Sequence, residues 1–465
     1  MDDILATQQS AQRRDGTPAA AIRIDRLDRA IGLLVDHADD IAGALSDDFG
    51  HRSREGTLIS DVVSSIDALK HAKRHVRRWM RRDRRGVSPA PLAWLGARAW
   101  VDYQPKGVVG VIAPWNFPFN LTFAPLAGIL AAGNRAMIKP SEFTPRSSAL
   151  MQAMVAKAFD PSEVAVVTGD QSVAEAFSRL PFDHLLFTGA TSVAKHVMRA
   201  AAEHLVPLTL ELGGKSPAIV GRDADLDLAA KRLLFGKTLN AGQVCVAPDY
   251  ALVPADAVDA FVDALARHVG AMFPTARGNA DYTSIVNDRH KDRLDGYLRD
   301  AREKGATVRP LVASGGEAGR RDMPPTVVLG GSRDMAVLRE EIFGPILPIV
   351  SYGRLDDAID YVNAGARPLA LYYFGNDRAA QERVLEKTVA GGVTINDTVV
   401  HLTQDNLPFG GIGPSGMGGY HGFDGFRTFS HARGVYRQSR FDVTAMLRPP
   451  YGDAIRRVLA LKLKR

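Results

Sequence analysis

Three side chains in this sequence have the types needed for covalent chemistry on a carbonyl group. Cys245 is the only cysteine in 465 residues and follows the small-residue turn in "LNAGQVC". Glu211 stands 34 residues earlier, in "LELGGKSP". Asn116 lies in "APWNFP", between an apolar segment and a predicted helix. A thiolate can attack a carbonyl carbon, an amide N–H can hold the resulting oxyanion, and a carboxylate can activate water.

Each of these residues taken singly also has a simpler interpretation. A lone cysteine is most often a small buried apolar residue, and an asparagine before a helix is most often an N-cap. One cysteine excludes an intrachain disulfide and a zinc site made of cysteines alone. His71 and His75 are four residues apart, but no glutamate follows His71 as in zinc proteases. We therefore expect no metal site.

The composition is that of an ordinary soluble globular protein, with 46% hydrophobic and 24% charged residues. The length predicts two or three domains. "MDDILATQQS" lacks a basic region followed by an apolar core, which argues against a signal peptide. No apolar run approaches the roughly 20 residues that span a bilayer. Together with the absence of disulfides, these features predict a cytoplasmic protein.

The net charge of +6 is concentrated in one segment. Residues 70–85, "KHAKRHVRRWMRRDRR", contain nine Lys or Arg and one Asp, so this segment alone carries +8. We interpret it as the solvated face of one long helix, because a nucleic-acid surface usually spreads its charge over a face with aromatic residues for stacking. We expect no nucleic-acid partner.

The elements that must position the three side chains alternate between strand and helix. Residues 20–85 have apolar positions at helical spacing. Strands are then expected at "GVVGVIAP", "RAMIK", "EVAVVTG", "DHLLFTG", "LTLEL", "PAIV" and "YALVP", with helices between them. One predicted helix, residues 225–242, leads into Cys245. This alternation predicts an α/β fold with parallel sheets.

Taken together, the motifs resemble the aldehyde dehydrogenase superfamily from about residue 20 to residue 440. The resemblance rests on "APWNFP", "KPSE" (139–142), "FTG" (187–189), "LELGGKSP", "GQVC", "EIFGP" (341–345) and "NLPFGGIGPSGMGGYHG" (406–422). "CVAPDY" and "SGMGGYHG" resemble its class 3 branch. "DFGHRSREGTLISDV" and "YHGFDGFRTFSHARGV" look like the bacterial coniferyl aldehyde dehydrogenases.

The resemblance implies a role for each of the three side chains. Cys245 is the expected nucleophile, passing through a thiohemiacetal and a thioester. Asn116 and the backbone N–H of Cys245 are expected to form the oxyanion hole. Glu211 is expected to activate the water that releases the acid.

The resemblance also implies a nicotinamide cofactor, because no side chain can accept hydride. Lys139 and Glu142 are expected at the adenosine ribose, Gly189 at the pyrophosphate, and Glu341 and Phe343 at the nicotinamide ribose and ring. The full expected cofactor set is Trp115, Lys139, Glu142, Gly189, Ala190, Val193, Glu341 and Phe343. NAD is expected to bind better than NADP, because the Glu142 carboxylate would repel a 2′-phosphate.

The turn "FTGATSVA" departs from the family pattern. Ala190 replaces the usual Ser, and Ala194 replaces a common Gly. The first change removes a hydroxyl that could contact the pyrophosphate, and the second could crowd the helix against its strand. Both replacements are expected to affect the affinity for the cofactor, and neither changes which cofactor is expected.

The implied architecture is a Rossmann-type dinucleotide-binding domain, an α/β catalytic domain and a small oligomerisation strand element. We place the dinucleotide-binding domain at residues 1–211, of which 98–105 contribute to oligomerisation. The catalytic domain is expected at residues 212–400. Residues 401–445 are expected to return to the cofactor domain and the oligomerisation element. Residues 446–465 form a basic amphipathic tail, for which packing or fraying is favoured over membrane contact. The class 3 resemblance implies a homodimer.

Three functions remain open from the sequence. The first is oxidation of an aldehyde, most simply an aromatic or cinnamyl-type aldehyde such as coniferyl aldehyde, with fatty or medium-chain aldehydes as the alternative. The second is a cysteine esterase or acyltransferase, which would not need Lys139, Glu142, Gly189 and Glu341 together. The third is a non-catalytic protein that reuses the fold, against which the intact chemical side chains speak.

Overall fold

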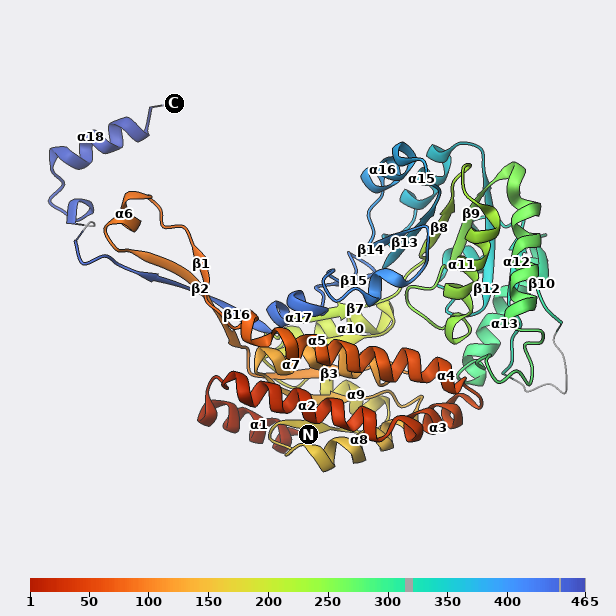
Figure 1. The fold of residues 1–465 in the computed structure, drawn as a ribbon, viewed down its shortest axis with the longest axis horizontal. Helices are drawn as coiled ribbons and strands as arrows, with labels where there is room; N and C mark the ends of the chain where they lie inside the picture. Colours follow the sequence, from red (N-terminus) through yellow and green to blue (C-terminus); the bar gives the residue numbers. More distant parts are fainter. Residues whose placement is uncertain (314–320, 443–444, 465) are drawn as a thin grey trace.

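The computed structural model describes residues 1–313, 321–442 and 445–464. Two lobes, each built around a mostly parallel sheet, form the body, and an antiparallel ribbon projects from it with the C-terminal segment at its tip (Figure 1). One buried apolar cluster contains residues of both sheets, Val111 and Tyr372 among them. The two lobes therefore share a core, and the loops between them are held from both sides.

The first sheet has six strands. Its order is β15 (Gly416–Met417), β7 (Leu208–Glu211), β6 (His184–Thr188), β3 (Val108–Ile112), β4 (Arg135–Lys139) and β5 (Val164–Val166). All neighbours are parallel except β15, which runs antiparallel to β7. Strands β3, β4, β5 and β6 are buried along their whole length, as expected when helices cover both faces. The α/β expectation is confirmed.

Helices cover this first sheet. They are α1 (Asp2–Asp15), α2 (Ala20–Asp36), α3 (Ala38–Phe49), α4 (Arg54–Thr57), α5 (Ser64–Trp79), α7 (Asn120–Ala132), α8 (Pro145–Ala158), α9 (Gln171–Ser178) and α10 (Thr191–Ala202), with a π-helical turn η1 (Leu58–Val63) between α4 and α5. Helix α7 is apolar all round because it packs against α2 and α5 and against β4. Gly133 ends it in the left-handed region, with φ 91°.

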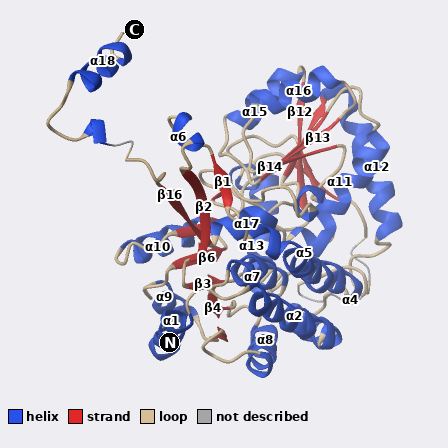
Figure 2. Cartoon of the chain, turned by 60° about the vertical axis from the view of Figure 1, so that its left-hand side comes forward, coloured by secondary structure: helices blue, strands red, loops and turns tan. Residues whose placement is uncertain are grey.

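The second sheet has seven strands. Its order is β10 (Thr307–Pro310), β11 (Thr326–Leu329), β12 (Ile346–Tyr352), β9 (Tyr250–Pro254), β8 (Pro217–Val220), β13 (Ala370–Phe374) and β14 (Gly392–Ile395). Only the β10–β11 pair is antiparallel. Helices surround it (Figure 2): α11 (Leu226–Thr238), α12 (Val258–Met272), α13 (Asp288–Glu303), α14 (Ala336–Arg339), α15 (Leu355–Asn363) and α16 (Arg378–Lys387). Short 3₁₀ turns are η2 (Leu239–Gly242), η3 (Ala255–Ala257), η4 (Val400–Thr403) and η5 (Ala445–Leu447).

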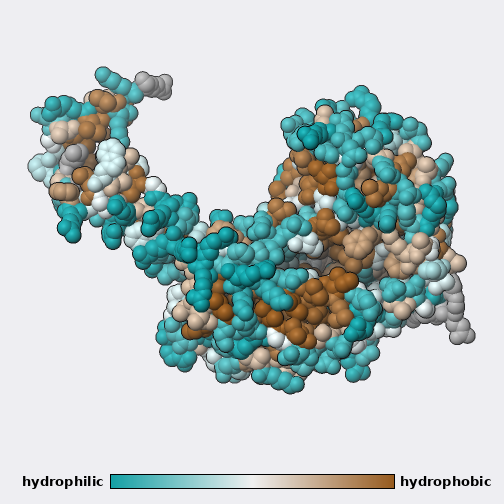
Figure 3. Space-filling view, in the orientation of Figure 1, coloured by the Kyte–Doolittle hydropathy of each residue, from teal (hydrophilic) through white to brown (hydrophobic). Residues whose placement is uncertain are grey.

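The ribbon is a three-stranded antiparallel sheet. Its strands lie in the order β1 (Asp83–Arg85), β2 (Arg98–Pro105) and β16 (Ser430–Arg437). Among the described residues, one edge of β16 is therefore unpaired. The remaining elements are α6 (Pro91–Trp94) at its tip, α17 (Gly422–Thr428) at its base and the C-terminal α18 (Asp453–Lys462). Apolar side chains gather on the tip (Figure 3), where Trp94, Leu461 and Leu463 are exposed.

Two predicted helices are wrong in their extent. The helix expected at 225–242 ends at Thr238, because Asn240 and Ala241 adopt left-handed φ of 49° and 52° in the turn that follows. The basic segment 70–85 does not lie on one long helix. Helix α5 ends at Trp79, and Asp83–Arg85 instead pair with Ala99–Val101 as the edge of the ribbon.

The expected division into domains stays a proposal. Among the described residues, no helix is both long and apolar enough to cross a membrane.

Candidate active site

The three candidate side chains come from three different element ends. Glu211 is the last residue of β7, Asn116 lies in the loop between β3 and α7, and Cys245 follows the turn η2. The negative charge of Glu211 contributes to raising the pKa of Cys245, which means that the two groups interact at close range. The fold therefore brings together residues that are 34 positions apart in the sequence.

Cys245 is held as a neutral thiol. Burial, followed by the negative charges of Glu341 and Glu211, raises the pKa of the thiol to about 12, whereas the backbone N–H groups of Cys245 and Val246 oppose this shift. A thiol with so high a pKa carries almost no thiolate at neutral pH. A base must take its proton before it can attack.

Glu211 is a buried carboxyl without a partner. Glu211 is 3% exposed, and neither of its carboxyl oxygens has a hydrogen-bond partner among the residues that the structure describes. Burial raises its pKa well above the ordinary value. The backbone holds the residue firmly, since its carbonyl accepts the N–H of Gly189 at 3.0 Å and β7 is paired on both edges. An unpartnered buried carboxyl costs stability and is typical of a functional site.

Asn116 is tied to the cysteine turn through its side chain and its backbone. Its Nδ2 donates to the carbonyl of Gln243 at 3.1 Å, and its own carbonyl accepts from Nδ2 of Asn240 at 3.1 Å. An amide nitrogen carries two N–H groups. One is used by Gln243, and the other is available to a substrate oxygen.

The turn around Cys245 is fixed by Gln243, which is fully buried. Its Nε2 donates to the carbonyls of Asn240 and Ser284 at 3.0 and 3.1 Å. Its Oε1 accepts the backbone N–H of Val286 at 3.0 Å. The left-handed turn at Asn240 is therefore locked by hydrogen bonds to a second segment, which orients the thiol.

A buried ion pair supports the Asn116 loop. Nη2 of Arg52 lies 2.6 Å from Oδ2 of Asp61, and both side chains are almost completely buried. Nη1 of Arg52 donates to the carbonyl of Asn116 at 2.8 Å, and Oδ1 of Asp61 accepts the N–H groups of Phe119 and Asn120. Asp61 lies in the π-helical turn η1, a feature often found near functional sites.

The residues expected at the adenosine ribose lie together at the end of β4. The side chain of Lys139 is 1% exposed, and its Nζ donates to the Pro140 carbonyl at 2.7 Å and lies 3.6 Å from Oε2 of Glu142. Burial lowers the pKa of Lys139, although the Glu142 carboxylate opposes that shift. The Glu142 side chain is 35% exposed and can face a bound molecule.

The residues expected at the pyrophosphate mark the start of α10. Gly189 follows β6, Ala190 is the N-cap residue of α10, and no side-chain hydrogen bond caps the helix. Val193 is exposed in the first turn. The N-terminus of a twelve-residue helix offers free N–H groups of the kind that bind phosphate.

Glu341 and Phe343 face Trp115 and the Gly213 turn. A Cβ atom on Gly213 would lie only 2.0 Å from Oε1 of Glu341, so the missing side chain makes room for this carboxyl. Burial raises the pKa of Glu341 to about 7, opposed by the N–H of Gly214. The ring of Phe343, a residue with φ 51°, meets Trp115 edge-on at 5.3 Å.

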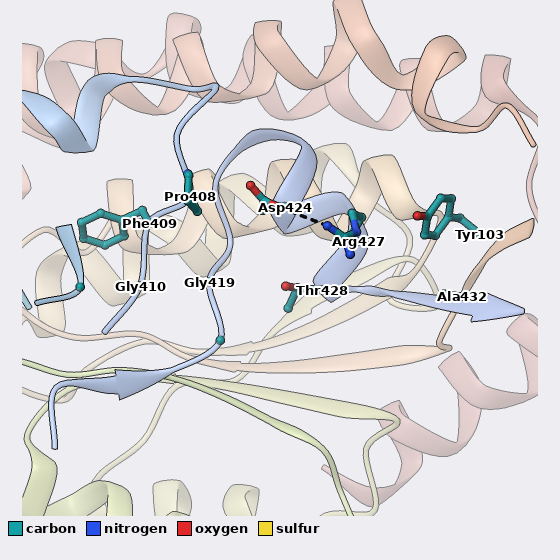
Figure 4. A pocket seen from close by; sticks show the side chains of 11 residues that line it. Tyr103, Pro408, Phe409, Gly410, Gly419, Asp424, Arg427, Thr428 and Ala432 are labelled. Atoms are coloured by element: carbon teal, nitrogen blue, oxygen red, sulfur yellow. Dashed lines mark ion pairs between the residues drawn. The ribbon is translucent and has the colours of Figure 1, made fainter. Parts of the chain in front are cut away.

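Two cavities accompany this arrangement. One, of about 410 Å³, includes Glu341, Gly213, Gly214 and Thr191 in its lining and therefore opens onto the candidate site. The other, of about 440 Å³, lies at the base of the ribbon between Tyr103, Phe409 and the Asp424–Arg427 ion pair (Figure 4). None of the predicted site residues lines that second cavity.

Comparison with known proteins decides the family. Residues 1–435 match the profile of the aldehyde dehydrogenase family. The chain belongs to the aldehyde dehydrogenase family. It is 57% identical to a probable coniferyl aldehyde dehydrogenase of Caulobacter vibrioides, over 100% of this chain and 97% of that protein. It is 52% identical to a coniferyl aldehyde dehydrogenase of a Pseudomonas species, covering 99% and 95%.

Two further similarities bear on the fold and its function. A dimeric, NADP-preferring aldehyde dehydrogenase of Rattus norvegicus is 36% identical, over 93% of each chain. The substrate-bound structure of Staphylococcus aureus AldH superposes with a TM-score of 0.93 at 34% identity, covering 99% of both chains. The fold predicted from the sequence is confirmed, and the protein is an NAD(P)-dependent aldehyde dehydrogenase.

The residues present fit a nicotinamide cofactor. Within the described residues, Oγ1 of Thr188, Oε1 of Glu341 and both carboxyl oxygens of Glu211 are buried without hydrogen-bond partners. Thr188 and Glu211 are paired at the ends of β6 and β7. The space above Gly213 would be closed by any side chain. Within residues 1–313, 321–442 and 445–464, no cluster of side chains could hold a metal ion.

Sequence reasoning missed the groups that support the aldehyde dehydrogenase site. Arg52 and Asp61 both lie within "DFGHRSREGTLISDV". In the sequence this segment indicated only the resemblance to the bacterial coniferyl aldehyde dehydrogenases. Gln243 lies within "GQVC", where only the cysteine was given a role. Tyr420 was also missed. It is 2% exposed, and burial, followed by the charges of Glu211 and Cys245, raises its pKa, so it interacts electrostatically with both groups.

Proposed function

We propose that this aldehyde dehydrogenase oxidises a cinnamyl-type aldehyde, such as coniferyl aldehyde, to the carboxylic acid. The substrate class is supported by the relatives named coniferyl aldehyde dehydrogenase at 57% and 52% identity over nearly the whole chain. The chemistry is supported by one structural observation above all. A buried carboxyl with two unpartnered oxygens, Glu211, interacts with the single thiol, Cys245.

In the proposed mechanism, Cys245 supplies the nucleophile. Because its pKa is high, the thiol must pass its proton through water to the solvent as sulfur bonds to the carbonyl carbon. Glu211 acts later, in the release of the acid. The carbonyl oxygen becomes an oxyanion, which the free N–H of Asn116 Nδ2 and the backbone N–H of Cys245 stabilise. A tetrahedral thiohemiacetal results.

The nicotinamide cofactor, when bound, supplies a hydride acceptor for the carbon held on sulfur. Loss of the C–H bond leaves a thioester on Cys245. Glu211 then removes a proton from water, the water oxygen bonds to the acyl carbon, and the C–S bond breaks to give the acid and the thiol. Burial keeps Glu211 protonated at low pH, so this step needs a pH high enough to ionise it.

In the same proposal, eight residues hold the cofactor: Trp115, Lys139, Glu142, Gly189, Ala190, Val193, Glu341 and Phe343. The contact between Trp115 and Phe343 and the ion pair between Lys139 and Glu142 support this grouping. The aliphatic Ala190 offers only backbone groups to the pyrophosphate, because the hydroxyl common in the family is absent.

We further propose that NAD is preferred over NADP. Two like charges about 4 Å apart repel by roughly 4 kcal/mol at an effective dielectric near 20. Lys139 lies beside Glu142 and can pair with a 2′-phosphate, which offsets part of this repulsion. A preference for NAD over NADP of about tenfold to a hundredfold is therefore expected. Glu142→Gln should narrow the preference by improving the KM for NADP. The rat relative is named NADP-preferring. For this reason kcat/KM must be measured for NAD and for NADP, in the wild type and in the Glu142→Gln variant. A variant with unchanged preference would remove Glu142 from this role.

The substrate proposal is tested with a series of aldehydes. Coniferyl and other cinnamyl-type aldehydes should show a higher kcat/KM than acetaldehyde, hexanal and dodecanal, followed by NADH absorbance at 340 nm. A preference for the aliphatic aldehydes would favour the alternative of a fatty or medium-chain aldehyde dehydrogenase. Acid release from esters without any NADH formation from aldehydes would favour a cysteine esterase.

A homodimer is proposed for the assembly. In the described part of the chain, strand β14 at the end of the second sheet and strand β16 of the ribbon each have one unpaired edge, and such edges favour pairing with another chain. The exposed Trp94, Leu461 and Leu463 at the ribbon tip add apolar surface. We also propose the domain limits given above and a cytoplasmic location. For the C-terminal tail, packing or fraying is favoured over membrane contact.

A further inference from the structure

The cavity of about 410 Å³ beside Glu341 is rich in basic side chains. These are Lys215, Arg333, Arg339 and Arg367. Among the described residues of its lining, Glu341 is the only acidic one, and it is also the only one of the eight expected cofactor residues found there. The proposed mechanism gives the four basic side chains no role.

Lys215 belongs to the framework of the cavity. Its Nζ donates to Asp249, and to the carbonyls of Val337 and Glu340 at 2.9 and 3.0 Å. These two carbonyls bracket the segment that contains Arg339, so the lysine fixes the turn that carries this arginine. The charge of Lys215 is balanced by Asp249 inside the protein, which leaves three guanidinium groups to the cavity.

The protein holds the three arginines in different ways. Arg333 is tethered, because it donates to the Tyr361 carbonyl at 3.0 Å and its guanidinium carbon lies 3.8 Å from the centre of the Tyr361 ring. Arg339 and Arg367 are exposed, and within the described residues no side-chain hydrogen bond or ion pair involves either of them. Two guanidinium groups without partners in one cavity suit an oxyanion, since each presents parallel N–H donors.

The cavity also offers apolar surface. Leu338, Val362, Pro368 and Pro414 line it together with small residues. A small inorganic anion would leave these side chains in contact with water, whereas an organic anion with an apolar body would cover them. A volume of about 410 Å³ lies within the range of small-molecule sites. The lining therefore suits a ligand that carries a negative group on an apolar body.

We propose that this cavity binds an aromatic carboxylate, the class to which the product of the proposed reaction belongs, with its carboxylate on Arg339 and Arg367. For the identity of the ligand this inference rests on the proposed function, since oxidation of a cinnamyl-type aldehyde yields such an acid. Neither Cys245 nor Asn116 lines the cavity, so the acid would occupy a place other than that of the aldehyde carbonyl. From beside Glu341 it would slow turnover as its concentration rises.

The test uses ferulate, the carboxylate formed from coniferyl aldehyde, and compares two double variants. Arg339→Gln/Arg367→Gln removes the two guanidinium groups without partners, whereas Arg77→Gln/Arg78→Gln removes two exposed charges from the last turn of α5. By calorimetry on the full chain, ferulate should bind the wild type and the α5 variant alike, and the cavity variant at least tenfold more weakly. With saturating NAD, ferulate should inhibit the wild type noncompetitively against the aldehyde.

Four results decide between the site and its alternatives. If the cavity variant binds ferulate within twofold of the wild type, the two arginines do not hold the carboxylate and the inference is wrong. Inorganic phosphate that binds as tightly as ferulate would show that the apolar lining contributes nothing, against an aromatic ligand. Purely competitive inhibition against the aldehyde would place the acid in the substrate site instead. If coniferyl aldehyde is not oxidised but ferulate binding still depends on Arg339 and Arg367, the proposed substrate fails and the cavity site stands.

Discussion

At the scale of single residues, burial disfavours the charged forms of Cys245 and Glu211. Burial raises the pKa of each group, and the negative charge of Glu211 raises that of Cys245 further. With a pKa of about 12, the thiol is neutral at pH 7. In the proposed mechanism this keeps the thiol inert until a substrate is in place.

The pH dependence of acid release follows from Glu211. A carboxyl with a raised pKa is protonated below that pKa and acts as a base above it, so the rate of deacylation should rise with pH. Glu211→Gln should slow deacylation by about 10²- to 10⁴-fold and abolish this rise. Single-turnover release of acid, measured from pH 5 to pH 9, checks both effects. A variant with the wild-type rate and pH profile would exclude Glu211 as the base.

The chemical residues could be predicted from the sequence, but their surroundings could not. The motifs contain a thiol, a carboxylate and an amide, and these groups indicate the chemistry expected of Cys245, Glu211 and Asn116. Lysine is a residue type that is mostly exposed, yet the side chain of Lys139 is 1% exposed. Gln243 carries no local signal, since its role depends on carbonyls that only the fold brings near.

At the scale of elements, the site depends on loops anchored from outside the chemistry. Arg52 and Asp61 hold the Asn116 loop, and Gln243 holds the turn before Cys245. The sequence predicted the strands before these loops because parallel strands buried on both faces read as apolar runs. The end of α11 was predicted four residues too late, because left-handed Asn240 and Ala241 follow from tertiary hydrogen bonds and not from local preference.

The buried ion pair gives a prediction at this scale. Asp61→Asn leaves the Arg52 charge unpaired in the core and should lower the free energy of unfolding by about 3–5 kcal/mol. It should also lower kcat/KM, because the amide NH₂ that replaces Oδ2 cannot pair with Arg52, whose Nη1 holds the carbonyl of Asn116. Urea denaturation and steady-state kinetics measure the two effects.

An exposed pair provides the matched control. Asp39 and Arg54 have side chains that are 79% and 56% exposed, so Asp39→Asn should cost less than about 1 kcal/mol and leave kcat/KM unchanged. Equal stability and equal activity of the Asp61 and Asp39 variants would contradict the supporting role of the buried pair.

At the scale of the whole molecule, the edge of the second sheet predicts the assembly. The N–H groups of Gly392 and Asn396 donate to β13, so by alternation the N–H of Ile395 points to the open edge of β14. Ile395→Pro removes that outward donor without breaking a bond to β13, and proline is tolerated on edge strands. The wild type should have twice the mass of the chain by light scattering, whereas the variant should shift toward a single chain with unchanged circular dichroism. A wild type that is monomeric, or a variant that stays dimeric, would contradict edge pairing through β14.

The central claim is that Cys245 carries the acyl group through oxidation and release. Its most direct test is intact and peptide mass spectrometry of Glu211→Gln after mixing with coniferyl aldehyde and NAD. The account predicts one NADH formed per site and an acyl adduct on the peptide that contains Cys245, with no adduct in a Cys245→Ala variant. NADH formation at the same rate without any adduct on Cys245, or an adduct on another residue, would contradict it.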